Sequence, residues 1–276
     1  MRALFFAALL FTGVTTAQAT SESNVRLYAM DCGRLEFTDL APFADTGEYD
    51  GHPGTLMASC YLIRHPRGDL LWDTGIGDKY AVDPAGMQLP NYRAIVRKTV
   101  QSQLREIGLD FSDIEFFAFS HAHADHLGNA DRLGKAQWIV NPKELVWLAS
   151  VPSPPRTNLA LIGARDPSKT ISITGDHDVF GDGAVKILSA PGHTPGHQVL
   201  LVRLAKHGPL LLSGDLYHSH ENRQGRRMPV FNVSRAETLA SMERIESIIR
   251  NQRARLVIQH SVADFYSLPH SPSFLD

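Results

Sequence analysis

The chain has 276 residues, of which 43% are hydrophobic and 20% are charged, and its formal net charge is −2. A chain of this length can bury one large hydrophobic core, and it fits a single domain better than two. Its nearly balanced charge argues against nucleic-acid binding, because proteins that bind nucleic acids concentrate positive charge on one face.

The first 19 residues have the composition of a secretory signal. They contain a positively charged start, an apolar run at residues 3–14 and an Ala-Gln-Ala cleavage motif that ends at Ala19. We expect a signal peptide at residues 1–19, a mature domain at residues 20–276 and an exported protein, periplasmic or secreted. An uncleaved membrane anchor is the alternative, but the apolar run is well short of the ~20 residues of a spanning helix. We therefore expect no stable membrane association after cleavage.

Cleavage would leave 257 residues with a net charge of −3, because Arg2 is removed and no acidic residue is lost. The mature chain contains two cysteines, Cys32 and Cys60. In an oxidising compartment they form either a disulfide or a pair of buried free thiols. Neither belongs to a C-x-x-C motif, so we do not expect them to bind a metal.

Short apolar runs broken by turn residues predict a β-sheet in the first part of the mature chain. Strands are expected at residues 25–30, 60–63 and 70–73. Residues 37–53 are rich in Asp, Gly and Pro and predict a long loop, which in a compact domain is more often functional than idle. Apolar residues at helical spacing between Tyr92 and Ile107, followed by Gly108, predict an amphipathic helix.

The most distinctive stretch is Ser-His-Ala-His-Ala-Asp-His at residues 120–126, directly after an apolar run that predicts a buried strand. His121 and His123 project to the same side of an extended segment, whereas Asp125 and His126 follow at the turn into a helix. This mixture of imidazole and carboxylate is typical of zinc ligands. The loop predicts a metal site that can serve two ions, and a histidine-rich surface loop is the weaker alternative.

Strands and helices alternate in the second half. Asn141 is expected to cap a helix, with a proline in the first turn and Glu144 at the capping-box position, and Ser234 is expected to cap another. Residues 151–170 form either a surface segment near the site or a plain connector. Further strands are expected at residues 138–140, 185–188, 198–204, 210–212 and 256–258. The pattern predicts an α/β sandwich of sheets with helices outside.

Three later strand ends carry further ligand candidates, namely His193 in Gly-His-Thr-Pro-Gly-His, Asp215 in Ser-Gly-Asp, and His260. Loops at one edge of a sheet converge in space, so these residues can share one pocket with the first motif. The four features occur in an order that resembles the metallo-β-lactamase superfamily and extends over nearly the whole mature chain. The resemblance implies that superfamily's four-layer αβ/βα sandwich.

The resemblance also implies a dinuclear metal centre with two zinc ions per chain, other divalent transition metals being alternatives. The first ion would be held by His121, His123 and His193, the second by Asp125, His126 and His260, and Asp215 would bridge them. His197 matches no ligand position and is expected to support the ligands or to pack beside them. Asp73, in Asp-Thr-Gly, is expected to orient a ligand.

Further segments are similar to the N-acyl homoserine lactonase family, a group of quorum-quenching hydrolases. They are residues 25–33, 73–75, 214–218 and 258–269. This resemblance implies a small-molecule lactone substrate, opened by a metal-bridging hydroxide, with Asp125 passing a proton to the leaving alkoxide. A homodimer is also consistent with it. The alternative is a hydrolase of the same fold that cleaves a β-lactam, an aryl ester or a phosphotriester, while a non-catalytic binding module is disfavoured because all seven ligand positions are filled.

Two positions depart from the lactonase pattern. The family places a catalytic tyrosine three residues after the bridging aspartate, but here that position is His218 and Tyr217 precedes it. Neighbouring side chains of an extended segment point to opposite sides, so we expect only one of the two to face the metals, and we favour Tyr217. Ser261 stands where the family commonly has aspartate, which puts the support of His260 in question.

Overall fold

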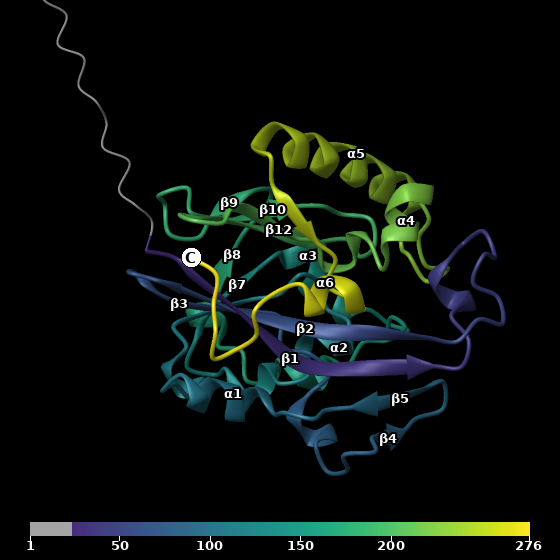
Figure 1. The fold of residues 1–276 in the computed structure, drawn as a ribbon, viewed down its shortest axis with the longest axis horizontal. Coiled ribbons are helices and arrows are strands. Elements are labelled where there is room, and N and C mark those ends of the chain that lie inside the picture. The colour runs from purple at the N-terminus through teal and green to yellow at the C-terminus, as the bar shows by residue number, and fades with distance from the viewer. Residues whose placement is uncertain (1–23) are drawn as a thin grey trace, which may run out of the picture.

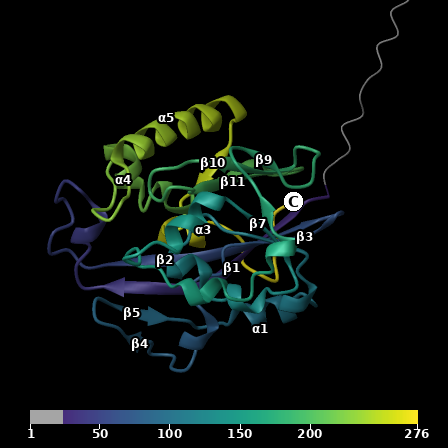
Figure 2. The same cartoon turned by 180° about the vertical axis from the view of Figure 1, so that it is seen from behind.

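The computed structural model describes residues 24–276, and the predicted signal peptide at residues 1–19 lies outside them. Two mixed β-sheets pack face to face, and helices cover the outer face of each. Figure 1 shows α5 (Arg235–Gln252) over one sheet and α1 (Val100–Glu106) over the other, and Figure 2 shows these layers from behind. The predicted four-layer αβ/βα sandwich is confirmed.

The first sheet is built from the eight strands between residues 26 and 172. Its spatial order is β4 (Met87–Gln88), β5 (Tyr92–Ile95), β1 (Arg26–Phe37), β2 (Gly54–His65), β3 (Gly68–Trp72), β6 (Phe116–Ala118), β7 (Gln137–Val140) and β8 (Ile171–Ser172). Strands β3, β6, β7 and β8 pair in parallel. Their carboxyl ends therefore meet at one edge, where the chain continues into Asp73, the histidine loop and Asn141.

The second sheet is built from the second half of the chain. Its order is β13 (Arg255–Val257), β12 (Gly208–Leu212), β11 (Gln198–Leu204), β10 (Val185–Ser189) and β9 (His177–Asp178). Strands β12 and β13 pair in parallel, with Leu212 opposite Val257. The segments that follow them, which carry Asp215 and His260, therefore leave the sheet in the same direction.

Alternation along the strands divides the apolar residues between two layers, as expected for strands buried on both faces. On β2, Tyr61 and Ile63 belong to the core between the sheets, whereas Leu62 belongs to the cluster under α1. On β11, Leu200 lies between the sheets and Leu201 contributes to the cluster under α5. Burying each large apolar side chain contributes roughly 1.5–3 kcal/mol, so these layers fix the frame of the site.

The helix expected between Tyr92 and Ile107 is wrong in its first half. Tyr92–Ile95 is strand β5, which pairs with β1, with Ala94 opposite Leu35. The helix begins only after Thr99, whose side chain accepts a hydrogen bond from the backbone N–H of Ser102 at 3.0 Å. Long-range strand pairing thus overrides a local helical pattern.

Short helices occupy the connections around this frame. The remaining α-helices are α2 (Ala124–Leu127), α3 (Pro142–Leu148), α4 (His220–Gly225) and α6 (Val262–Tyr266). The 3-10 helices are η1 (Ala41–Phe43), η2 (Asp78–Tyr80), η3 (Phe111–Asp113), η4 (Ala130–Arg132), η5 (Leu159–Ile162), η6 (Pro167–Lys169) and η7 (Gly214–Leu216). In the part of the chain that the structure describes, no helix combines the length and apolar character needed to cross a membrane.

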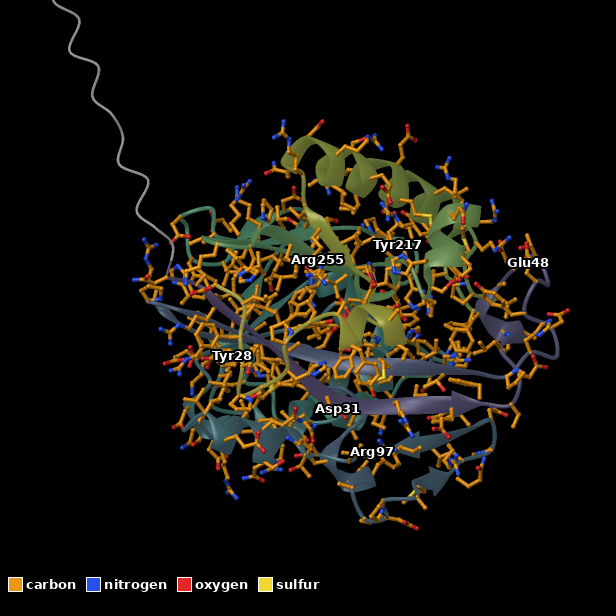
Figure 3. The ribbon with its side chains drawn as sticks, in the orientation of Figure 1. Tyr28, Asp31, Glu48, Arg97, Tyr217 and Arg255 are labelled. Carbon is orange, nitrogen blue, oxygen red and sulfur yellow. A yellow bond between two sulfur atoms is a disulfide. The ribbon has the colours of Figure 1, made fainter. Side chains whose placement is uncertain are left out.

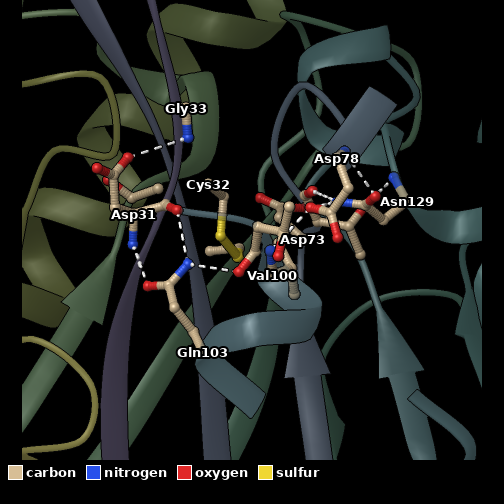
Figure 4. Close-up of a disulfide and its surroundings, with 12 residues drawn as sticks. Asp31, Cys32, Gly33, Asp73, Asp78, Val100, Gln103 and Asn129 are labelled. Carbon is tan, nitrogen blue, oxygen red and sulfur yellow. Dashed lines mark hydrogen bonds between the residues drawn. A yellow bond between two sulfur atoms is a disulfide. The ribbon is translucent and has the colours of Figure 1, made fainter. Parts of the chain in front are cut away.

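The two cysteines form a disulfide, which decides between the alternatives left open by the sequence. Cys32 on β1 and Cys60 on β2 have Cα atoms 5.8 Å apart. Figure 4 shows the bridge beside a contact from α1, in which the Gln103 amide donates to the Asp31 carbonyl at 2.8 Å and accepts from the Asp31 N–H at 3.0 Å. The bridge and this amide both hold β1 where its register shifts, between Asp31 and Arg34.

Candidate metal centre

The ligand candidates lie at the edge of the sandwich where the strands of both sheets end. Asp73 and the histidine loop follow β3 and β6 of the first sheet, whereas Asp215 and His260 follow β12 and β13 of the second. His193 follows β10 in the same second sheet. The convergence that the sequence predicted is therefore produced by both sheets presenting their loops to one place.

Two glycines let the loops approach this closely. Gly214, directly before Asp215, has φ +49°, and a Cβ there would lie 2.7 Å from the Cβ of Ser120. Gly192, directly before His193, has φ +134°, and a Cβ there would lie 2.2 Å from the backbone nitrogen of Thr238. Any side chain at either position would clash and would strain the backbone, so glycine is required.

A first group of four donors is fully buried. His121, His123, His193 and Asp215 place one ligand atom each within 4.8 Å of one another. His123 Nδ1 lies 2.8 Å from His121 Nε2 and 3.1 Å from His193 Nε2. Asp215 Oδ2 lies 3.2 Å from His193 Nε2. Three imidazoles and one carboxylate oxygen thus surround one point, which is the donor set of a tetrahedral zinc site.

A second group lies on the other side of the same carboxylate. Asp125, His126 and His260 also place ligand atoms within 4.8 Å of one another. The other oxygen of Asp215, Oδ1, lies 3.0 Å from His260 Nε2 and 3.2 Å from His126 Nε2. The structure therefore brings together all seven positions proposed from the sequence, and Asp215 presents one oxygen to each group.

Asp73 holds the second group from behind. It is fully buried with φ +56°, an unfavourable backbone conformation for a non-glycine residue that is characteristic of functional sites. Its Oδ1 accepts from the Ser120 N–H at 2.7 Å, and its Oδ2 lies 3.0 Å from His126 Nδ1 and 2.7 Å from Gln259 Nε2. With Nδ1 donating to Asp73, the lone pair of His126 Nε2 faces the site, as expected for a residue that orients a ligand.

The support of His260 comes from the backbone. Its Nδ1 lies within hydrogen-bonding distance of the Met57 carbonyl oxygen, so its Nε2 faces Asp215. Ser261, where the lactonase pattern has aspartate, caps α6 by accepting from the N–H of Asp264 at 3.2 Å. The serine thus has a helix-capping role, and the carbonyl group orients His260 without it.

His197 lies behind Asp215 and supports it. Its Nδ1 donates to the Ala190 carbonyl oxygen at 2.9 Å, which leaves Nε2 to accept from the Asp215 backbone N–H at 2.9 Å. Burial lowers the pKa of His197 to about 3, so the imidazole is neutral and fits this pattern. Because both ring nitrogens are engaged, His197 cannot serve as a ligand, as the sequence analysis expected.

The donor set fits divalent cations. Although His126 Nε2 lies close to Asp215 Oδ1, neither atom makes a hydrogen bond of good geometry within residues 24–276. A buried polar atom without a partner costs about 1–3 kcal/mol, which a bound cation would offset. Burial lowers the pKa of His121 and of His123 well below the usual range, which keeps these imidazoles neutral, the form that binds metals.

The structure corrects the preference for Tyr217. Its side chain is buried on the far side of the segment, and its hydroxyl donates to Glu246 Oε1 on α5 at 2.9 Å, close to α4 and α5 in Figure 3. His218 is also buried, but its Nε2 lies 3.1 Å from Asp215 Oδ2. The physical reason is that η7 ends at Leu216 and Tyr217 is already extended, so Tyr217 and His218 point to opposite sides and the turn leaves His218 on the side of Asp215.

A rim of aromatic residues and one arginine surrounds the donors. The ring centroid of Phe43, in the loop predicted at residues 37–53, lies 5.3 Å from that of His218, and that of Phe231 lies 5.8 Å from His123. Arg156 places its guanidinium carbon 3.9 Å from the Phe231 centroid, while its carbonyl oxygen accepts from the Ala124 N–H at 2.9 Å. Sequence reasoning missed Arg156, since no motif marks it, although residues 151–170 do lie near the site.

An apolar pocket opens beside the donors. It has a volume of about 310 Å³. Its apolar wall includes Leu40, Phe43, Leu56 and Val262, His218 and His260 lie at its inner end, and the rest of its lining includes the polar residues Ser219, His220, Glu221 and Ser261. A chain of methylene groups bound there would lie against aliphatic and aromatic side chains, with its end close to His218 and to His260 of the second group.

Comparison with known proteins agrees with this architecture. Residues 53–260 match the family model of the Metallo-beta-lactamase superfamily. The N-acyl homoserine lactonase AttM of Azorhizobium caulinodans is 28% identical over 265 residues, which cover 92% of this chain and 100% of AttM. AttM of Agrobacterium fabrum is 27% identical over 270 residues, which cover 91% of this chain and 99% of that protein.

Two solved structures show the same fold. An N-acyl homoserine lactone hydrolase with the product N-hexanoyl-L-homoserine at its catalytic metal centre aligns with a TM-score of 0.75 and 22% identity, over 90% of this chain and 98% of that one. AidC, a dizinc quorum-quenching lactonase, aligns with a TM-score of 0.66 and 18% identity, over 86% and 87%. With the family match spanning most of the sequence, the chain belongs to the metallo-beta-lactamase superfamily.

Proposed function

We propose that this protein is a dinuclear metal-dependent hydrolase that opens the lactone ring of N-acyl homoserine lactones. The observation that carries the proposal is the position of Asp215, whose two oxygens face two separate groups of ligand candidates. The lactonases to which the chain is similar match it over nearly their whole length. The proposal therefore compares whole proteins and not a single shared domain.

Two divalent ions, zinc in this proposal, would supply Lewis acidity and a water of lowered pKa to this site. In the proposal, His121, His123 and His193 hold the first ion, and Asp215 bridges both. Asp125, His126 and His260 hold the second ion. The imidazoles of His126 and His260 are directed inward by the bonds that their Nδ1 atoms make, so these two positions exist before the ions arrive.

Asp125 is proposed to carry a proton. It is the one member of the cluster that is only partly buried, and its Oδ2 lies 3.8 Å from His260 Nε2. A carboxylate in this position can accept the proton released when water attacks the ester carbonyl carbon. It can then return that proton to the oxygen of the departing alcohol.

His218 is proposed to donate a hydrogen bond to the oxygen that becomes negatively charged as the lactone carbonyl is attacked. Its Nε2 is directed toward Asp215 Oδ2, so the proton on that nitrogen faces the reacting region. Its ring is held by its packing against Phe43 and by the stacked imidazole of His260, with centroids 5.3 Å and 5.2 Å away. A preorganised donor of this kind stabilises the transition state more than the ground state.

The apolar pocket supports an acylated substrate. It begins at His218 and His260 and continues between Leu40, Leu56 and Val262. A fatty acyl chain is apolar and flexible, and burying it contributes about 0.8 kcal/mol for each methylene group. This lining favours an N-acyl lactone over a polar substrate of the same reaction class.

We also propose that the protein is exported. The Cys32–Cys60 disulfide supports this, because disulfides persist in oxidising compartments such as the periplasm. Expression of the full chain followed by fractionation and N-terminal sequencing tests the proposal. The expected mature protein begins at Thr20 and is recovered outside the cytoplasm.

The proposed activity is tested with purified protein and a panel of substrates. The panel holds N-hexanoyl and N-decanoyl homoserine lactone, a β-lactam, an aryl ester and a phosphotriester, each with and without a chelator. We expect ring opening of the lactones, its loss with chelator and its recovery with added zinc. Faster turnover of any of the other three substrates would replace the proposal with that hydrolase activity.

A further inference from the structure

Glu144 is a buried acid that the proposed chemistry does not use. The sequence pattern assigns it to a capping box at the start of α3, but the cap is made by Asn141, whose side chain accepts from the Lys143 N–H at 3.0 Å. Glu144 is 1% exposed and turns inward. Within the described part of the chain, its carboxylate has no ion-pair partner.

Both oxygens of Glu144 accept backbone hydrogen bonds from loops that carry ligand candidates. Oε2 accepts from the N–H of Ala122 at 2.9 Å, and Ala122 lies between His121 and His123. Oε1 accepts from the N–H of Gly196 at 2.6 Å, three residues after His193. One carboxylate therefore joins the two loops that supply all three imidazoles of the first group.

The fit around this carboxylate is close. A Cβ on Gly196 would lie 2.9 Å from Glu144 Cγ and 2.8 Å from Asn141 Cγ, so the loop is pressed against α3. Burial raises the pKa of Glu144, and its hydrogen bonds with the backbone of Gly196 and Ala122 oppose that effect. Burying a carboxylate is costly unless it is paired or hydrogen-bonded, and two backbone donors from two loops provide that compensation here.

A second buried acid has the corresponding place on the other side of the centre. Asp73 contacts His126 of the second group, through Oδ2, and the Ser120 N–H at the start of the histidine loop, through Oδ1. Glu144 contacts only the loops of the first group. Each group of donors thus has one buried carboxylate behind it, and each would place a negative charge near a bound cation.

We infer that Glu144 is a positioning residue for the first metal ion, which it serves by fixing the distance between the His121–His123 loop and the loop of His193. The inference rests on the proposed dinuclear function. Replacing the carboxylate by an amide puts an N–H group against one backbone N–H, so one of the two loops loses its attachment. Supporting contacts of this type typically contribute 10- to 100-fold in metal affinity.

The test measures zinc affinity by competition with a chromophoric chelator, in two backgrounds that each leave one ion. His260→Ala disables the second position, and His193→Ala disables the first. In the His260→Ala background we expect Glu144→Gln to weaken the remaining zinc about 10- to 100-fold. In the His193→Ala background we expect the same substitution to change zinc affinity by less than about 3-fold.

Matched controls separate positioning from general damage. Asp178→Asn removes another carboxylate that accepts two backbone N–H bonds, from Gly181 and Gly183, and should leave both zinc affinities unchanged. Thermal unfolding of the metal-free proteins checks that each variant folds. If Glu144→Gln does not fold, Glu144→Asp replaces it as the test variant and is measured in the same way.

The outcomes are distinct. Unchanged zinc affinity in the His260→Ala background, or an equal loss in both backgrounds, overturns the inference. A parent protein that binds fewer than two zinc ions contradicts the proposed dinuclear function instead, so the two failures cannot be confused.

Discussion

The imidazole of His218 lies with its Nε2 3.1 Å from Oδ2 of Asp215, inside the cluster of ligand candidates. We expect His218→Ala to lower lactone turnover by about 100-fold, since a preorganised donor near the developing oxyanion typically contributes a factor of this size. Zinc content should stay at the wild-type value, because the seven ligand candidates remain. Steady-state kinetics together with elemental analysis provides the measurement.

Tyr217→Phe is the matched control for this substitution, because Tyr217 lies next along the chain but faces α5. Its hydroxyl bonds to Glu246, so its loss should lower the free energy of unfolding by about 1 kcal/mol and leave turnover within about 2-fold. A large loss of lactone turnover in Tyr217→Phe, with unchanged turnover in His218→Ala, would show that the loop rearranges when substrate binds. Unchanged turnover in both variants would mean that neither residue is the oxyanion donor.

The same pair of residues shows where sequence reasoning stops. Alternation predicts that only one of Tyr217 and His218 faces the centre. Which of the two does so is decided by the preceding turn η7, which begins at Gly214. By contrast, the histidine motifs could be recognised because metal ligands must be closely spaced, so their pattern is local. The strands that present them are short apolar runs, and these were also predictable from the sequence.

Features that depend on contacts between distant segments could not be predicted. Tyr92–Ile95 has helical spacing but becomes β5 because it completes the sheet beside β1. Glu144 stands at a capping position, yet its carboxylate binds two loops that lie 22 and 52 residues away in the chain. Arg156 belongs to a segment without periodic pattern, and only the fold places it above Phe231.

Asp215 and His197 provide a second comparison. We expect Asp215→Ala to lose both bound ions and turnover, because its two oxygens face both groups of donors. His197→Ala removes one acceptor for the Asp215 backbone N–H, so it should weaken zinc binding only about 10- to 100-fold and leave two ions bound in excess zinc. Elemental analysis after equilibration in excess zinc distinguishes the two. Equal losses would place His197 among the ligands.

The disulfide should contribute to stability and not to chemistry. It closes a loop with a sequence separation of 28, for which the chain-entropy estimate is about 3–4 kcal/mol. We expect the double variant Cys32→Ser and Cys60→Ser to have a free energy of unfolding that is lower by this amount, and therefore to unfold at a lower denaturant concentration. Lactone turnover per folded molecule should be unchanged. Chemical unfolding with and without a reductant measures the effect. If the reductant does not change the denaturant concentration at which half of the wild-type protein is unfolded, the expected stabilisation by the disulfide is contradicted.

Arg156 is expected to bind the part of the substrate that lies outside the lactone ring. Its guanidinium stacks on Phe231 and lies 5.2 Å from the Phe43 centroid, at the rim of the donor cluster. In the part of the chain that the structure describes, this guanidinium has cation–π contacts but no hydrogen bond or ion pair. Its donors are therefore available to a bound molecule. An N-acyl homoserine lactone has an amide carbonyl next to the ring, and this oxygen is a suitable acceptor.

We therefore expect Arg156→Met to raise KM for N-decanoyl homoserine lactone about 10-fold, the loss of one hydrogen bond to a charged donor. The value of kcat should change little, because Arg156 is not among the groups that face Asp215, and the methionine keeps the apolar contact with Phe231. A γ-lactone with an alkyl chain but no amide is the matched substrate, and its KM should be the same for both proteins. An equal rise for the two lactones would mean that Arg156 shapes the pocket without binding the amide, and an unchanged KM for both would remove it from substrate recognition.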